Sequence, residues 1–184
     1  MITSQGSKQV YSNRWMTVRE DQVQFPNGDK GVFGVVEKPD FVAIVALDAE
    51  NRIHLVQQYR YPIGQRSWEI PMGAWQDQPD AALETVALGE LKEETGFTPG
   101  KISKIGHFFQ APGYSSQGCH LFLATDLRAG ATEREATESD MISAGFSPPQ
   151  LRQMIANGEI KDATTIAAFG YLMLSAEWSA MFAP

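Results

Sequence analysis

Hydrophobic runs in the first third of the chain predict strands. Residues 41–48 (FVAIVALD) are almost continuously apolar, which is typical of a strand that is covered on both faces. Residues 53–60 (IHLVQQYR) follow a polar turn and are expected to return as a second strand. Before them, residues 10–37 mix alternating runs with a Pro-Asn-Gly-Asp turn at 26–29, which predicts a hairpin or small antiparallel sheet.

A helical pattern begins at Pro79. Asp80 is expected to cap or charge the first turn of this helix, and Gly96 is expected to end it. Further elements are predicted as strands near 101–109 and 118–125, a helix from Ser147-Pro148 to Asn157-Gly158, and a final helix of roughly 18 residues opening at Asp162. This order of strands and helices predicts a mixed α/β layer architecture.

Charge and composition narrow the function classes. The 184 residues include 43% hydrophobic side chains, which can bury a core, and carry a formal net charge of −7. An acidic chain repels the phosphates of nucleic acid, so binding of a nucleic-acid polymer through a basic face is not expected. The acidity does not exclude small phosphate compounds, because a bound divalent cation reverses the local sign of charge.

The N-terminus and the cysteine content favour a cytoplasmic protein. No apolar run approaches membrane-spanning length, and the first fifteen residues lack the apolar core of a signal peptide. The single cysteine, Cys119, excludes an intramolecular disulfide and suits a reducing compartment. We interpret it as a small buried strand residue rather than a nucleophile.

The strongest chemical feature is the acidic helix segment 89–97 (GELKEETGF). Glu90 and Glu94 lie one helical turn apart, with Glu93 beside them. Both fall within the apolar stripe of the helix, which consists of Leu83, Val86, Ala87 and Leu91. A merely solvated acidic face fits this placement badly. Stacked carboxylates on a buried face repel one another, and a bound hard cation such as Mg²⁺, or alternatively Mn²⁺, removes the penalty.

Residues 73–97 (GAWQDQPDAALETVALGELKEETGF) resemble the Nudix box, G-x5-E-x7-R-E-U-x-E-E-x-G-U, where U is aliphatic or bulky and apolar. Aligned on Glu90, the box places an aliphatic residue at Leu91 and paired acids at Glu93 and Glu94. The resemblance implies a Nudix fold, an α/β/α sandwich around a mixed sheet. It also implies that the three glutamates bind metal, and that the backbone carbonyl of Met72 is a further ligand.

The box departs from the family pattern at three positions. Gly89 stands where the arginine is expected, and Ala81 stands where the first glutamate is expected. Trp75 occupies the slot of the leading glycine, and Gly73 lies two residues earlier, so the loop before the helix is longer. The missing arginine and glutamate generally form a structural ion pair in this family. Losing both is milder than losing one, which would leave an uncompensated charge.

Segments outside the box resemble the ADP-ribose and nucleoside-diphosphate-sugar pyrophosphatase branch of the family. They are QQYRYPIG (57–64), WEIPMGA (68–74), QAPGYSS (110–116) and GEIKDATTIAAF (158–169). Arg60 could clamp a pyrophosphate oxygen, or it could simply pair with an acid. The resemblance places Glu69 at the substrate or metal site, and Trp68 beside it could stack on a base.

A catalytic base and the histidines complete the candidate chemistry. In this branch a further catalytic glutamate lies in a loop that corresponds to residues 135–141 (EATESDM). Glu138 is our choice, with Glu135 and Asp140 as alternatives, and Glu93 is the other candidate for the general base. The three histidines are expected to be structural strand residues, because no spacing suggests a zinc site. They are His54, His107 and His120.

The predicted function is Mg²⁺-dependent hydrolysis of the diphosphate bond of ADP-ribose or a nucleoside diphosphate sugar. The products are a nucleoside monophosphate and a sugar phosphate. One alternative is a catalytically silent Nudix-like module that senses a nucleotide, and another is hydrolysis of nucleoside triphosphates or dinucleoside polyphosphates. The resemblance also implies a homodimer. Residues 1–39 would form a dimerising strand region and residues 40–184 the Nudix hydrolase domain.

Overall fold

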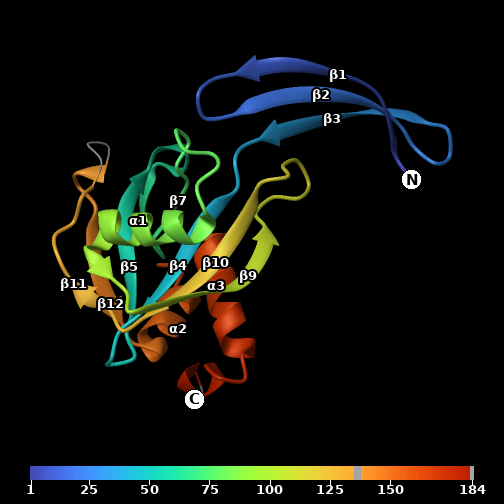
Figure 1. Cartoon of the computed structure of the whole chain (residues 1–184). Coiled ribbons are helices and arrows are strands. Elements are labelled where there is room, and N and C mark those ends of the chain that lie inside the picture. Colours follow the sequence, from blue (N-terminus) through green and yellow to red (C-terminus); the bar gives the residue numbers. More distant parts are fainter. Residues whose placement is uncertain (135–137, 183–184) are drawn as a thin grey trace.

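The computed structural model describes residues 1–134 and 138–182 (Figure 1). The N-terminal strands are β1 (Thr3–Ser12), β2 (Thr17–Gln24) and β3 (Lys30–Glu37). The central sheet contains β4 (Phe41–Leu47), β5 (Ile53–Arg60), β6 (Gln65–Glu69), β7 (Met72–Gly73), β9 (Lys101–Phe109), β10 (Gly118–Thr125) and β12 (Ile142–Phe146). A short pair is formed by β8 (Phe97–Thr98) and β11 (Arg128–Ala129). The helices are α1 (Leu83–Thr95), α2 (Pro148–Ala156) and α3 (Ala163–Leu174), with 3₁₀ turns η1 (Tyr61–Ile63) and η3 (Ser179–Phe182).

The central sheet is mixed and covered by helices on both faces. Its strand order is β12-β5-β4-β10-β9, with β6 added to β5 and β7 added to β4. The β4–β10 pair is parallel, whereas β4–β5, β5–β12 and β9–β10 are antiparallel. Helix α1 lies on one face and helices α2 and α3 lie on the other (Figure 1). The α/β/α sandwich predicted from the sequence is therefore confirmed.

Strand β4 is the centre of the core. All seven of its residues are buried, as the continuous apolar run predicts. Alternate side chains face opposite layers: Val42, Ile44 and Ala46 pack in the cluster under α1, and the others pack in the cluster with α2 and α3. Burial on both faces is what fixes the position of the strand, and with it the position of the helix that carries the glutamates.

The N-terminal strands form a separate three-stranded antiparallel sheet that extends away from the body (Figure 1). Every residue of β1 is exposed. This strand begins at Thr3, earlier than the predicted start of the strand region at residue 10. Residues 3–9 carry no sequence signal for a strand, because a strand that faces solvent on both sides has no apolar alternation and depends on pairing with β2.

Two helix boundaries differ from the prediction. Helix α1 begins at Leu83 after an Ala82 cap, so Asp80 does not cap it; residues 75–81 instead form turns in which Gln78 N–H bonds to Trp75 O and Ala81 N–H to Gln78 O. The last helix ends at Leu174, because Ser175 is extended, and it is shorter than predicted. Gly96 closes α1 with a φ of 78°, as expected. None of the helices in the described ranges is long and apolar enough to cross a membrane.

Candidate metal and substrate site

Helix α1 directs two carboxylates toward the sheet. Glu90 is 8% exposed and Glu94 is 1% exposed. Strand β7 runs beneath them, since Ala43 of β4 pairs with Met72. The Glu90 carboxylate lies against the backbone at Gly73, where a Cβ atom would be only 2.4 Å from Glu90 Oε2. A larger residue at position 73 would have to displace the Glu90 carboxylate from this place.

The Glu94 carboxylate is poorly compensated by the protein. Burial raises the pKa of Glu94 well above its usual value, and the nearby charges of Glu138 and Glu90 raise it further. A hydrogen bond from the Met72 backbone and the charge of Arg60 oppose this shift only in part. Oε2 of Glu94 is buried and has no hydrogen-bond partner within the described residues. A buried oxygen in this situation is a suitable ligand for a cation.

The donor set fits a hard divalent ion. Glu90, Glu93 and Glu94 lie within about one turn of α1, with Glu93 half-buried, and all offer carboxylate oxygens. Oxygen donors are those preferred by Mg²⁺ and Mn²⁺. The structure brings the backbone of Met72 next to Glu94, while its carbonyl as a metal ligand remains a prediction.

Arg60 is held by Glu69 near the glutamates of α1. Its Nε lies 3.0 Å from each carboxylate oxygen of Glu69, and its Nη2 lies 2.5 Å from Oε2. Burial alone would lower the pKa of Arg60, but the bonds and charge of Glu69, with the charges of Glu94 and Asp162, raise it overall. The pairing with an acid, one of the two alternatives for Arg60, is thus present. The side chain remains 39% exposed, which leaves it accessible to a ligand.

A cavity of about 500 Å³ adjoins these residues. Its walls include Met72 and Gly73, next to the glutamates, and the start of α3. The charged side chains that line it are Lys38, Arg60, Glu69, Lys161 and Asp162. Three cations thus lie in a cavity adjacent to buried carboxylates, an arrangement suited to a ligand with several negative charges and a bound cation.

The loop that carries Glu138 is attached to the end of α1. The Glu133 backbone N–H donates to Glu93 O at 3.0 Å, and Arg134 Nε donates to Glu94 O at 3.1 Å. Glu138 is half-buried, and its charge acts on Glu94, so it lies near the carboxylates of α1.

Asp140 and Glu135 are the alternatives to Glu138 as the catalytic acid of the loop. Asp140 instead faces the surface, where its carboxylate lies 2.6 Å from Arg66 Nη1. Its side chain is 61% exposed. Glu135 falls outside the described residues. Of the described candidates for the catalytic loop acid, Glu138 is therefore the one that lies near the glutamates of α1.

Comparison with known proteins places the chain in a family. The NUDIX domain model matches residues 37–169, and the model of the nucleoside diphosphate sugar hydrolase N-terminal domain matches residues 3–36. The chain belongs to the Nudix family. This confirms the resemblance found in the sequence and the expectation of a Nudix pyrophosphohydrolase.

Relatives and a solved structure agree with this Nudix assignment. The chain is 32% identical over 168 residues to the ADP-ribose pyrophosphatase of Bacillus subtilis (strain 168), covering 91% of this chain and 90% of the relative. It is 33% identical over 162 residues to the ADP-ribose pyrophosphatase of Mycobacterium tuberculosis (strain ATCC 25618 / H37Rv), covering 88% and 78%. A crystal structure of an ADP compounds hydrolase superposes with a TM-score of 0.82 at 18% identity, covering 97% and 94%, and supports the fold.

Trp68 of this Nudix protein does not line the cavity. Side chains alternate along β6, so Ser67 and Glu69 face the cavity, whereas Trp68 points to the other side. There its indole packs edge-on against Phe146, with ring centroids 5.0 Å apart. Stacking of Trp68 on a base remains an untested prediction.

Two cavity lysines of the Nudix site were missed by sequence reasoning. Lys38 precedes β4, and Lys161 precedes the Asp162 cap of α3. Lys161 lies in the segment 158–169 that resembles the pyrophosphatase branch, so its place before a capped helix was an available signal. For Lys38 the only signal is its position just before a buried strand, which does not distinguish it from a surface lysine.

Proposed function

We propose that this Nudix protein hydrolyses the diphosphate bond of ADP-ribose or a nucleoside diphosphate sugar. The observation that carries the proposal is the buried Glu94 oxygen, which lacks a partner within the described residues and lies beside a cavity lined by three cations. In a metal–diphosphate complex, the metal ion would compensate the buried charge of Glu94. The diphosphate would compensate the positive charges of Arg60 and the two lysines. Similarity to two proteins named ADP-ribose pyrophosphatase supports this substrate class.

Each residue of the site has a distinct task in this proposal. Glu90, Glu93 and Glu94, with the Met72 carbonyl, hold Mg²⁺ or Mn²⁺. An ion held there would neutralise charge on the diphosphate and would stabilise the charge that develops at phosphorus. Arg60, oriented by Glu69, binds a phosphate oxygen.

The remaining roles are phosphate binding by the two lysines and proton acceptance by a glutamate. Lys38 and Lys161 bind the other phosphate oxygens. Glu138, or alternatively Glu93, accepts a proton from the attacking water as the P–O bond to the leaving phosphate breaks. The proposal assigns Trp68 a packing role behind Glu69, on the evidence of its contact with Phe146.

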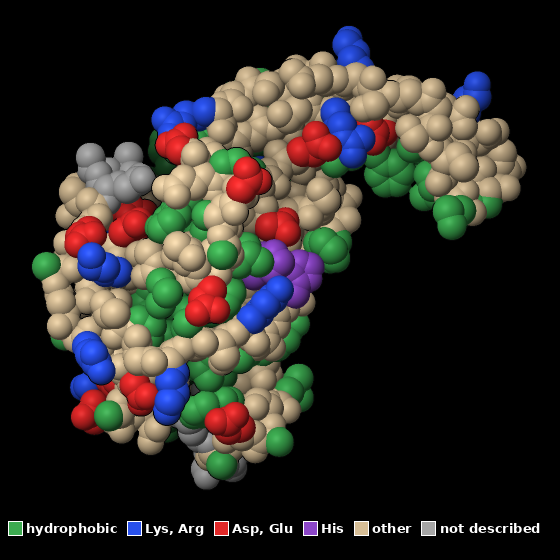
Figure 2. Space-filling model, in the orientation of Figure 1, with side chains coloured by type: hydrophobic (Ala, Val, Ile, Leu, Met, Phe, Trp, Pro, Cys, Tyr) green, Lys and Arg blue, Asp and Glu red, His purple; other side chains and the backbone are tan. Residues whose placement is uncertain are grey.

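The exposed N-terminal sheet supports a homodimer. A three-stranded sheet without a covering layer is marginally stable, and the solvated β1 is an unprotected edge. Large hydrophobic side chains are 38–57% exposed on this sheet and its first turn: Val10, Tyr11, Trp15, Val32 and Phe33. Figure 2 shows hydrophobic side chains on the underside of this arm, toward its free end. A second copy of the chain is the partner that we propose for this surface.

The reduced thiol is consistent with a cytoplasmic location, which is part of the proposal. Cys119 is fully buried on β10, and burial raises the pKa of its thiol to about 12. Such a thiol is unreactive and serves as a small core residue. Its structural role agrees with a compartment in which cysteines stay reduced.

The test is a substrate panel with product identification. ADP-ribose, several nucleotide sugars, nucleoside triphosphates and dinucleoside polyphosphates are incubated with the protein in Mg²⁺, in Mn²⁺ and in EDTA. We expect a nucleoside monophosphate and a sugar phosphate from the first two classes, and no turnover in EDTA. Preference for triphosphates or dinucleoside polyphosphates would replace the substrate assignment. Saturable binding without turnover would establish the silent sensor instead, and light scattering that finds only monomers would refute the dimer.

A further inference from the structure

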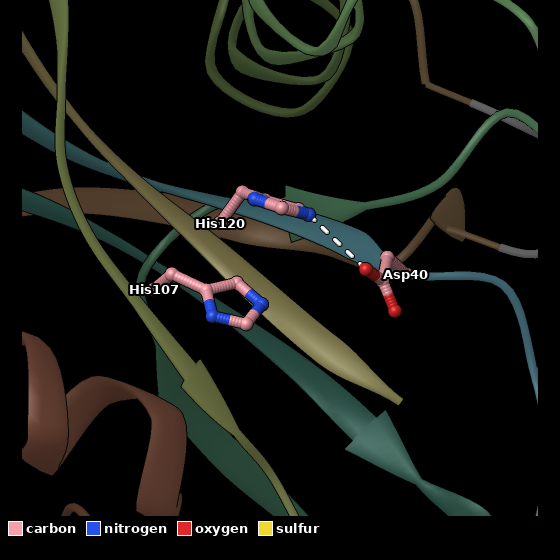
Figure 3. Close-up of side chains that lie close together, drawn as sticks. All are labelled: Asp40, His107 and His120. Atoms are coloured by element: carbon pink, nitrogen blue, oxygen red, sulfur yellow. Dashed lines mark hydrogen bonds and ion pairs between the residues drawn. The ribbon is translucent and has the colours of Figure 1, made fainter. Parts of the chain in front are cut away.

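A second group of metal-ligating side chains lies outside the glutamate site. It consists of Asp40, His107 and His120, shown in Figure 3. One ligand atom of each residue lies within 4.8 Å of the ligand atoms of the other two. His120 Nε2 is 3.2 Å from Asp40 Oδ2, and the two imidazole centroids are 4.7 Å apart. Histidine side chains are at the surface below the N-terminal arm (Figure 2).

The register of the central sheet brings these residues together. His107 of β9 and His120 of β10 are directly paired across the antiparallel ladder, so their rings share one face of the sheet. The parallel pairing of Cys119 with Phe41 places Asp40 beside Gly118, two positions before His120. Two adjacent strands, β9 and β10, thus contribute one histidine each, and Asp40 comes from the residue just before β4, the neighbour of β10.

Gly118 keeps the space between the ligands open. A Cβ atom at this position would lie 2.6 Å from His107 Nε2 and 2.9 Å from Asp40 Oδ2. The Gly118 N–H donates to Asp40 Oδ1 at 2.7 Å, which orients the carboxylate and leaves Oδ2 toward His120. His120 Nδ1 is buried without a hydrogen-bond partner within the described residues. The ring nitrogen of His120 that faces Asp40 is Nε2, so Nε2 is the ligand atom that His120 would offer to this site.

We propose that Asp40, His107 and His120 form a binding site for a divalent transition-metal ion, with Zn²⁺ as the ion that fits best. Two imidazole nitrogens and one carboxylate are typical ligands of Zn²⁺, whereas Mg²⁺ favours oxygen donors alone. Ligands at about 2.0–2.2 Å in a tetrahedron are about 3.3–3.6 Å apart, and the His120–Asp40 separation of 3.2 Å is close to this range. The exposed His107 side chain, whose ligand atom lies within 4.8 Å of the other two, would have to rotate toward the ion. The fourth position is open to water or another donor.

An ion at this site would fix one wall of the substrate cavity. Pro39 precedes Asp40, Gln117 precedes Gly118, and both line the cavity. Gln117 Nε2 already donates to Pro39 O at 2.7 Å. The ion would tie the start of β4 to β9 and β10, and thereby hold the segment that carries Lys38. Its role is to stabilise this wall, separately from the ion held by the glutamates.

The experiment uses Co²⁺ as a spectroscopic probe and Zn²⁺ as the competing ion on the full-length protein. We expect one equivalent of Co²⁺ to give the intense visible absorption of nitrogen-ligated, tetrahedral Co²⁺, and Zn²⁺ to abolish it. His107→Ala and His120→Ala should each weaken Zn²⁺ binding at least tenfold. Zn²⁺ should also raise the melting temperature of the unmodified protein and not that of these variants.

Two controls separate this site from the rest of the molecule. His54→Gln changes a histidine that bonds to Asp48 at 2.9 Å and lies outside the cluster, so its Zn²⁺ affinity should be unchanged. Glu94→Gln should retain the Co²⁺ spectrum, because it removes a ligand of the other site only. Unchanged Zn²⁺ affinity in the histidine variants, or its loss in Glu94→Gln alone, would overturn the proposal. If His120→Ala fails to fold, the same measurements on His107→Gln test the proposal, because His107 is exposed and its replacement should not disturb folding.

Discussion

The indole of Trp75 fills the space that a side chain at Gly89 would need. A Cβ atom on Gly89 would lie 2.0 Å from Trp75 Cζ2. Trp75 and Ala81 both pack against the hydrophobic cluster between α1 and the sheet. Two departures from the Nudix box, Gly89 and Ala81, therefore occur together with the third, the aromatic side chain of Trp75 from the longer loop. In this chain apolar packing replaces the ion pair that the box normally provides.

Gly89→Ala tests this packing through the sign of its effect on stability. In an unobstructed helix, replacing glycine by alanine stabilises by about 1 kcal/mol. Here we expect destabilisation by about 1–2 kcal/mol, because overpacking against Trp75 exceeds the gain in helix propensity. The control is the same substitution in a Trp75→Ala background, where it should stabilise. Thermal or urea unfolding of the four proteins decides, and stabilisation by Gly89→Ala alone would contradict the packing.

Local and non-local features differ in how far the sequence predicts them. The carboxylates of α1, its Gly96 end and the buried β4 depend on short-range periodicity, which is readable along the chain. The Trp75–Gly89 contact depends on how a turn-rich loop folds back onto a helix. The pairing of His107 with His120 depends on strand register, which sequence spacing does not reveal. Contacts between residues that are far apart in the sequence are therefore the features that the sequence predicts least well.

Glu94→Gln should stabilise the metal-free protein while abolishing metal-dependent activity. The folded-state pKa of Glu94 is raised, so the folded protein binds its proton more tightly than the unfolded chain does. That contribution is present below the unfolded pKa and is lost as pH rises through the folded pKa. At neutral pH without metal, the neutral glutamine should add on the order of 1 kcal/mol, or about 2–4 °C in Tm.

Calorimetry in EDTA at several pH values measures this effect. The stability difference between Glu94→Gln and the unmodified protein should shrink as pH falls and Glu94 becomes protonated. Mg²⁺ should raise the Tm of the unmodified protein and leave the variant unchanged. A variant that is less stable than the unmodified protein in EDTA at neutral pH would show that the charge of Glu94 is already well compensated.

Glu138→Gln and Glu93→Gln distinguish the general base from a metal ligand. Loss of a general base should lower kcat by about 10²–10⁴. If Glu138 is the base, Glu138→Gln should lower kcat without changing the Mg²⁺ concentration needed for half-maximal activity, whereas Glu93→Gln should raise that concentration. Asp140→Asn is the matched control on the same loop, because Asp140 is exposed and paired with Arg66. Full activity of Glu138→Gln would show that Glu138 is not the general base, and Glu93 would then be the candidate.

Arg60→Lys tests whether the Arg60–Glu69 pair serves substrate binding in addition to structure. Lysine keeps the charge but cannot form the two-pronged contact with Glu69, which is 3% exposed and would lose hydrogen bonds worth about 1.5–3 kcal/mol. We expect a lower Tm and, at temperatures where the variant is folded, a rise in KM of about tenfold for a diphosphate substrate. Arg66→Lys, on the neighbouring strand β6 and paired with the exposed Asp140, should leave KM unchanged. A lower Tm with unchanged KM would show that Arg60 acts only as the partner of Glu69, and the cavity lysines would then carry the recognition of phosphate.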